Sequence, residues 1–301
     1  MNKKLKVIDL FCGVGGLSYG FAHDDNFEIV AANEILLNMA KAYSLNHTTA
    51  KVYNEDIKDF NAQKTEKDLN VKANEIDIIV GGPPCQAYST LGKRLMDDQR
   101  GKLFQEYYRV LKEFNPKIFL FENVKGLLSM QGGELLKTII SLFESLGYKV
   151  RYKLLNAADF GAPQIRERVI IIGSKLKNNF QYPSQTHCRA EEAPNLFRTG
   201  LKPHLTLEEA ISDLPFIKSG EKSFEYVSEP KNEFQKIMRM NAPEKLMDHN
   251  APNNNAKLVK IMELLPDGGT PEDLPKELRP TSGFKNTYCR LWWNRQSTTI
   301  T

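Results

Sequence analysis

The stretch Asp9-Leu10-Phe11-Cys12-Gly13-Val14-Gly15-Gly16-Leu17 decides the fold, because it leads an apolar strand into a glycine-rich turn and on toward a helix. Glycines let a ligand approach the backbone closely, and the free amides of a helix N-terminus suit a polar or anionic group. The dinucleotide-binding pattern Gly-x-Gly-x-x-Gly would need a third glycine where this chain has Ser18. Glu34 closely follows the next apolar run, a position from which a carboxylate can hydrogen-bond ribose hydroxyls. The stretch therefore predicts a nucleotide-like ligand at the end of the first strand.

Apolar runs alternate with helical patterns on both sides of this turn. The runs cover residues 5–11, 27–32, 51–53, 76–80, 118–121, 150–155 and 169–173. Residues 102–114 and 133–146 repeat apolar side chains at spacings of three and four, which is typical of helices. This order predicts an α/β fold with a Rossmann-like, doubly wound, mostly parallel sheet covered on both faces. Such a sheet binds its ligand outside the carboxyl ends of the strands.

The composition changes after about residue 175. Prolines become frequent, polar loops lengthen, and a short helix at 205–214 with Thr206 as its N-cap is the clearest remaining element. We therefore expect a catalytic α/β domain at 1–175 and a smaller, loop-rich region at 176–301.

Composition excludes several classes of protein. The chain has 301 residues, 41% hydrophobic and 26% charged, so it can bury a core and is not disordered. No run approaches the roughly 18 apolar residues of a membrane helix, and the first apolar run is too short for a secretory signal. The four cysteines lie far apart with no Cys-x-x-Cys pair, which favours a reduced cytoplasm and no metal site. The net charge of +4 lies wholly in residues 151–301, a weak indication of a polyanionic partner.

Three further motifs carry chemistry. Gly81-Gly82-Pro83-Pro84-Cys85-Gln86 follows an apolar strand, and its prolines stiffen a loop that presents Cys85 as a candidate nucleophile. Phe121-Glu122-Asn123-Val124 ends another strand, so Glu122 is expected at the same rim of the sheet. In Gln164-Ile165-Arg166-Glu167-Arg168, strand alternation would place Gln164, Arg166 and Arg168 on one face.

In this order, the four motifs resemble the DNA (cytosine-5) methyltransferases, the S-adenosylmethionine-dependent enzymes of bacterial restriction–modification systems. The resemblance covers residues 5–175 and implies the class I methyltransferase fold. It also implies methyl transfer to C5 of a cytosine within a short duplex sequence. The cofactor-binding positions that it implies are Phe11, Gly13, Gly15, Gly16, Leu17, Glu34, Asp56, Ile57, Pro83 and Leu103.

The resemblance also assigns catalytic roles. The Cys85 thiolate would add to C6 of cytosine and make C5 nucleophilic, while Glu122 would hold N3 and the exocyclic amine. Arg166 would reach the cytosine O2, and Arg168 and Gln164 would order neighbouring loops.

DNA contacts are implied for two segments. The target base must leave the duplex, and a mobile loop from Gln86 through Ser89 to Arg100 would close over it. Gln164 is the remaining implied DNA contact, and residues 176–301 occupy the place of the family's target-recognition region.

The chain departs from the family pattern near its end. An Arg-Leu-Thr segment and a Gly-Asn-Ala-Val-like segment are expected after the recognition region, and neither is found before Thr301. A truncated product, an incomplete sequence and the large subunit of a split enzyme all remain open. The expected partners are therefore duplex DNA, a separate C-terminal subunit, and a cognate restriction endonuclease as genetic partner, with no membrane.

Three alternatives to a DNA methyltransferase remain open on the sequence alone. The chain could be a catalytically incomplete DNA-binding subunit of a split methyltransferase, or an RNA cytosine-5 methyltransferase that shares the same core. A nicotinamide oxidoreductase is the fold-level alternative, and both Ser18 and the Pro-Pro-Cys loop count against it.

Overall fold

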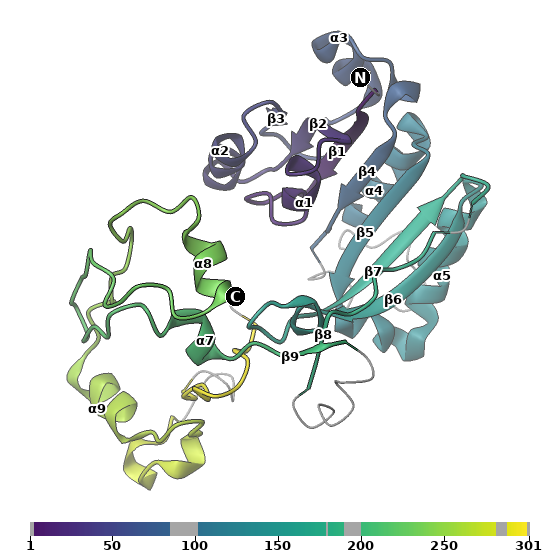
Figure 1. Ribbon diagram of the computed structural model, residues 1–301. Helices are drawn as coiled ribbons and strands as arrows, with labels where there is room; N and C mark the ends of the chain where they lie inside the picture. Colours follow the sequence, from purple (N-terminus) through teal and green to yellow (C-terminus); the bar gives the residue numbers. More distant parts are fainter. Residues whose placement is uncertain (1–2, 85–101, 179, 190–199, 281–287, 300–301) are drawn as a thin grey trace. The chain divides into compact units, whose positions relative to one another are not determined.

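The computed structural model describes residues 3–84, 102–178, 180–189, 200–280 and 288–299 (Figure 1). These fall into two compact units, the first comprising Met1–Leu155 and Glu167–Tyr182, the second Asn156–Arg166 and Pro183–Thr301. The expected division at residue 175 differs from this mainly at Asn156–Arg166. Backbone bonds explain the difference, because Ile165 donates to the Ser297 carbonyl at 2.8 Å and Ser297 donates to that of Pro163 at 2.9 Å.

A mixed sheet organises the first unit. Within the described residues it has seven strands: β1 (Leu5–Leu10), β2 (Phe27–Asn33), β3 (Lys51–Tyr53), β4 (Ile78–Gly81), β5 (Ile118–Val124), β6 (Lys149–Asn156) and β7 (Glu167–Ser174). Their order is β3-β2-β1-β4-β5-β7-β6, with parallel pairing from β3 through β5 and antiparallel pairing of β5 with β7. The chain turns to opposite sides of the sheet after β1 and after β4. The switch point where such sheets bind ligands therefore lies at the carboxyl ends of these two strands.

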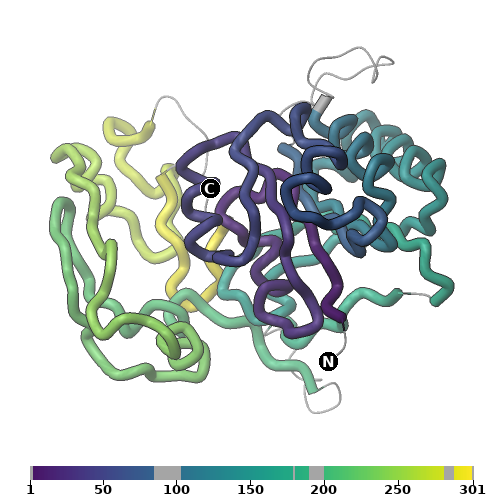
Figure 2. Tube along the Cα trace, turned by 90° about the horizontal axis from the view of Figure 1, so that it is seen from above, coloured from purple at the N-terminus to yellow at the C-terminus, as the bar shows by residue number. Residues whose placement is uncertain are grey.

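Helices cover both faces of the sheet. They are α1 (Tyr19–Ala22), α2 (Leu37–Asn46), α3 (Ala62–Leu69), α4 (Lys102–Phe114) and α5 (Glu134–Ser145), joined by short 3-10 turns η1 (Ala73–Glu75), η4 (Lys125–Leu128) and η5 (Met130–Gly133). Figure 2 shows the blue and teal coils of α4 and α5 gathered on one side of the purple trace of the first residues.

Strand alternation explains the two layers. Ile8, Ile79 and Phe119 point to the face where α4 and α5 supply buried aromatic and aliphatic side chains. Their strand neighbours Val7 and Ile78 point to the opposite face, which is covered in part by α1. Both faces are therefore apolar, as expected for strands buried between two layers of helices.

The second unit has little regular structure. Its elements are η6 (Ala157–Phe160), β8 (His187–Cys188), β9 (Lys202–Pro203), α7 (Leu207–Ile211), α8 (Glu233–Arg239), α9 (Ala256–Leu264), η8 (Pro271–Asp273) and η9 (Lys276–Leu278). The predicted cap at Thr206 is confirmed, since its hydroxyl accepts from the amide of Glu209 at 3.1 Å and the Glu209 carboxylate accepts from that of Thr206 at 2.8 Å. Among the described residues, no helix is both long and apolar enough to span a bilayer.

Candidate active site

The glycine-rich turn after β1 presents an open backbone. Phe11, Gly13 and Gly15 all have positive φ, and Phe11 packs half-buried against the main core. A Cβ added at Gly13 or Gly16 would meet no atom within 4 Å, so both glycines face open space. A ligand can therefore lie directly along this backbone, where a side chain would stand in its way.

Glu34 fixes the turn from the end of β2. Its Oε2 accepts the amide of Gly13 at 2.9 Å and its Oε1 accepts that of Leu36 at 2.8 Å. Each carboxylate oxygen can accept more than one hydrogen bond, so Glu34 keeps capacity for a ligand hydroxyl. The buried carboxylate thus lies beside the open glycine backbone, as a ribose-binding group would need.

Side chains around Glu34 complete this end of the sheet. Ile35 directly follows Glu34 and is 61% exposed, an apolar surface that the sequence analysis missed. The side-chain amide of Asn54 donates to the carbonyls of Glu34 at 2.9 Å and Ile35 at 3.0 Å, which ties the loop after β3 to this segment.

The remaining predicted cofactor positions lie close to the same core. Asp56 Oδ1 accepts the amide of Lys58 at 3.0 Å, and this bond lowers the pKa of Asp56. The Ile57 side chain is buried in the core, and its carbonyl accepts a hydrogen bond from the Arg109 guanidinium at 2.9 Å. Pro83 is buried, Leu103 is half-buried in the first turn of α4, and Leu17 packs half-buried on the α1 face.

A buried polar group that the sequence analysis missed lies beneath the turn. The Tyr43 hydroxyl is 3.4 Å from Oδ2 of Asp9 and 3.0 Å from the hydroxyl of Ser18. Burial raises the pKa of Asp9 to about 7 and also raises the pKa of the neighbouring Cys12 thiol. Because the hydrogen bond from Tyr43 to Asp9 links residues 34 positions apart, no local sequence pattern predicts it.

Glu122 lies at the end of β5, against the loop that follows β4. Its carboxylate pairs with the guanidinium of Arg168 at 2.9 Å, and a Cβ added at Gly82 would lie 3.0 Å from its Oε2. The neighbouring Asn123 side chain donates to the Pro83 carbonyl at 3.3 Å. Glu122 therefore lies beside Gly82 and Asn123 bonds to Pro83, three and two residues before Cys85.

The structure distinguishes the two arginines of the predicted motif. Arg168 is in β7 and contacts Glu122, whereas Arg166 precedes the strand and belongs to the second unit. The amide of Arg166 donates to Oδ1 of Asn156 at 3.1 Å, and Gln164 forms an isolated bridge with Ser297. The predicted residues Cys85, Gln86, Ser89 and Arg100 lie outside the described residues.

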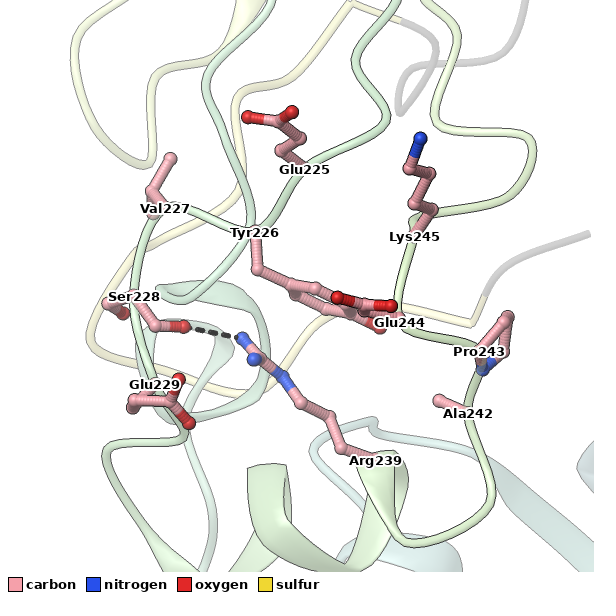
Figure 3. Close-up of a pocket in the computed structure, with 10 residues that line it drawn as sticks. All are labelled: Glu225, Tyr226, Val227, Ser228, Glu229, Arg239, Ala242, Pro243, Glu244 and Lys245. Atoms are coloured by element: carbon pink, nitrogen blue, oxygen red, sulfur yellow. Dashed lines mark hydrogen bonds between the residues drawn. The ribbon is translucent and has the colours of Figure 1, made fainter.

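The second unit contains a pocket of about 520 Å³, lined by residues 225–229 and 242–245 and by Arg239 (Figure 3). The Arg239 guanidinium lies 3.5 Å from the centre of the Tyr226 ring and pairs with Asp213 at 2.5 Å. It also donates to the Ser228 carbonyl at 2.9 Å, the dashed bond in Figure 3. The charged residues that line the pocket are three glutamates, Arg239 and one lysine. The pocket therefore offers no excess positive charge to a phosphate.

Comparison with known proteins gives the family. The profile described as C-5 cytosine-specific DNA methylase matches residues 5–272. The Type II methyltransferase M.AgeI of Thalassovita gelatinovora is 37% identical over 308 residues, covering 94% of this chain and 71% of that protein. M.AquIA of Picosynechococcus is 41% identical, covering 71% of this chain and 90% of that protein.

Solved structures agree on the fold. The crystal structure of a prophage-encoded DNA modification methyltransferase of E. coli superposes with a TM-score of 0.73 at 25% identity, covering 98% of this chain and 82% of that one. The DNMT2 structure from Spodoptera frugiperda, at 24% identity and a TM-score of 0.51, shares the fold over 73% of this chain. The glycine-rich turn, the Glu122–Arg168 pair and these matches together show that the chain belongs to the C-5 cytosine-specific DNA methylase family and is a DNA (cytosine-5) methyltransferase.

Proposed function

We propose that this chain transfers a methyl group from S-adenosylmethionine to C5 of a flipped cytosine within a short duplex sequence. One observation carries the proposal: Glu122, held by Arg168, lies beside Gly82 of the β4 loop, three residues before Cys85. A carboxylate, a guanidinium and the base of a loop bearing a thiol then share one edge of one sheet. This is the set of groups that cytosine methylation needs.

The turn after β1 fits S-adenosylmethionine. Gly13 and Gly16 leave room for the methionine part, and the Glu34 carboxylate stands where ribose hydroxyls need an acceptor. Exposed Ile35 and half-buried Phe11 offer apolar surface for the adenine. When bound, S-adenosylmethionine supplies a methyl group on a positively charged sulfur, which is a strong electrophile.

The chain's own residues would activate the base. The thiolate of Cys85 forms a bond to C6, and the electron pair displaced from the C5–C6 double bond makes C5 nucleophilic. Glu122 holds N3 and the exocyclic amine during this addition, which stabilises the charge that develops on the ring. Because Arg168 is the arginine beside Glu122, we assign to it the contact with O2 first expected of Arg166. After methyl transfer, a base accepts the C5 proton, the electron pair of that C–H bond reforms the C5–C6 double bond, and the C6–S bond breaks to release the Cys85 thiolate.

The biological setting follows from the class to which the relatives belong. M.AgeI and M.AquIA are Type II methyltransferases, so we infer a restriction–modification role in which methylation protects host DNA from a partner endonuclease. Residues 176–301 would read the target sequence, with Gln86, Ser89, Arg100 and Gln164 touching the DNA nearer the base.

The test is transfer of labelled methyl from S-adenosylmethionine to unmethylated duplex DNA, with RNA of the same sequence as a parallel substrate. We expect label in DNA cytosine, none in RNA, and none in DNA with Cys85→Ala. Label confined to RNA would refute the DNA reaction. Turnover by Cys85→Ala would exclude Cys85 as the nucleophile.

A further inference from the structure

One face of α2 contacts the glycine-rich turn at successive points. Tyr43, Asn46 and His47 are spaced at three and four residues, so they lie on the same side of the helix end. The Asn46 side chain donates to the Val14 carbonyl at 3.0 Å. The His47 ring closes over Gly15, where an added Cβ would collide with it.

Tyr43 supplies the buried part of this contact. The centres of its ring and the His47 ring are 4.3 Å apart, with the rings tilted by 35°, and Tyr43 has no exposed surface. Its hydroxyl lies between Ser18 and Asp9, and the Ser18 hydroxyl in turn lies 3.4 Å from the Gly15 carbonyl. A single oxygen therefore connects α2 to the beginning and to the end of the turn.

The polar atoms near this oxygen have few other partners. Asp9 Oδ1 and both ring nitrogens of His47 are buried and have no hydrogen-bond partner among the described residues. Removal of the Tyr43 hydroxyl would leave Asp9 with no side-chain donor except Ser18. A buried polar group that loses its hydrogen-bond partner destabilises the fold. The turn would therefore shift to give Asp9 a new partner.

We propose that Tyr43 is a positioning residue for the cofactor, acting through Ser18 and Asp9 to hold the glycine-rich turn in its binding conformation. The proposal rests on the proposed function, because it takes this turn as the S-adenosylmethionine site. Tyr43 does not face the open side of the turn, since its side chain is fully buried behind Cys12 and Ala32. Its effect on binding is therefore indirect and acts through the shape of the backbone.

The test compares Tyr43→Phe with Tyr148→Phe in the full chain. Tyr148 is the matched control, since it is also buried and its hydroxyl also donates one bond, to the Pro116 carbonyl at 2.8 Å. Affinity for S-adenosylmethionine is measured by calorimetry, and kcat and KM by methyl transfer to duplex DNA. For Tyr43→Phe we expect Kd and KM for S-adenosylmethionine to rise about three- to tenfold with kcat within about twofold of wild type. Tyr148→Phe should leave all three constants unchanged.

Other outcomes distinguish the positioning role of Tyr43 from the proposed function of the chain. If wild type binds S-adenosylmethionine and Tyr43→Phe binds it equally well, the positioning role is refuted and the proposed function stands. A lower kcat at unchanged KM would mean fewer folded molecules, which also refutes the positioning role. If wild type itself fails to bind, the assignment of the turn is wrong and both proposals fall. A Ser18→Ala change should add little to Tyr43→Phe, because the two hydroxyls act through one connection.

Discussion

Arg168 and Glu122 hold each other across two neighbouring antiparallel strands. Both side chains are about one-fifth to one-quarter exposed, so water screens the pair only in part. A charge-assisted bond of this kind orients the carboxylate as well as stabilising it. The orientation of Glu122 toward the β4 loop therefore depends on Arg168.

We predict that Arg168→Met lowers kcat for methyl transfer about tenfold or more, because Glu122 loses both its partner and its orientation. Affinity for S-adenosylmethionine should change little, since Arg168 contacts none of the turn residues. Lys125→Met is the control, because it breaks the more exposed Lys125–Glu167 pair of 2.8 Å in the same unit. Equal activity of the two variants would mean that the ion pair has no part in the reaction.

Asp9 is a fully buried acid of the first unit. Burial raises its pKa from 3.8 to about 7, with Ser18 and Tyr43 opposing the rise and Glu34 adding to it. Between these two pKa values the folded chain binds more protons than the unfolded chain. The stability that the neutral carboxyl provides is therefore complete below about pH 4 and is lost as the pH rises through about 7.

We predict that Asp9→Asn gains stability relative to wild type as the pH rises from 5 to 8, because asparagine cannot ionise. The Tm difference between variant and wild type should increase by several degrees, about what a few kcal/mol produces in a domain of this size. Burial lowers the pKa of His47, which acts in the opposite direction in both proteins and cancels in the difference. A difference that is constant with pH would show that Asp9 does not titrate in this range.

Single residues show where sequence reasoning stopped. The resemblance gave the base contact to Arg166 and the ordering of loops to Arg168. In the structure, Arg168 in β7 contacts Glu122, and Arg166 precedes the strand. Tyr43 looks like an ordinary aromatic residue of a helix until the fold brings it to Asp9. Contacts of this kind depend on long-range packing, which local sequence patterns do not encode.

The glycine-rich turn is the element whose shape is most tightly constrained. Gly15 has φ of +97°, a conformation that other residues adopt only with strain, and the His47 ring covers the place of a Cβ. Gly20, in α1, has open space at the same place and no positive φ. The two glycines therefore respond differently to the same added methyl group.

We predict that Gly15→Ala lowers S-adenosylmethionine affinity by about tenfold or more and lowers Tm by several degrees. Gly20→Ala should leave affinity unchanged and raise Tm slightly, because alanine favours the helix. Calorimetric titration and thermal melting of both variants provide the measurement. Normal cofactor binding by Gly15→Ala would place the cofactor elsewhere.

Elements with local signals were predicted well. The spacing of apolar residues predicted a helix at 102–114, which is the extent of α4. Thr206 forms the predicted N-cap of the helix expected at 205–214, which is shorter in the structure and extends over Leu207–Ile211. The strand at 169–173 was also recognised, but its antiparallel pairing with β5 was not. Strand pairing depends on contacts between segments that are far apart in the chain. The sequence therefore predicted the strand but not which strands lie beside it.

At the scale of the whole molecule, the described groups proposed to act on the cofactor and on the base, Glu34, Glu122 and Arg168, lie in the first unit. The net charge of +4 lies in the same unit, within residues 151–155 and 167–182, because the second unit has 17 basic and 17 acidic side chains. Contacts to DNA phosphates weaken steeply as salt rises, because they release counterions. Binding of S-adenosylmethionine at the glycine-rich turn should involve few contacts that release counterions.

We predict that raising salt from 50 to 200 mM weakens binding to duplex DNA by about tenfold or more. Affinity for S-adenosylmethionine should change by less than about twofold over the same range. Fluorescence anisotropy with a labelled duplex and calorimetry with S-adenosylmethionine give the two curves. Parallel salt dependence of both ligands would contradict this difference between DNA binding and cofactor binding.

The order of strands in the sheet has a consequence for synthesis of the protein. β7 follows β6 in the chain but lies beside β5, so β5 has no partner on that side until residue 174 has been made. Until then, Phe119 and Phe121 belong to an open apolar edge that invites pairing with other nascent chains. A ribosome that pauses between residues 124 and 174 prolongs this exposure. The yield of usable protein therefore depends on how quickly that stretch is translated.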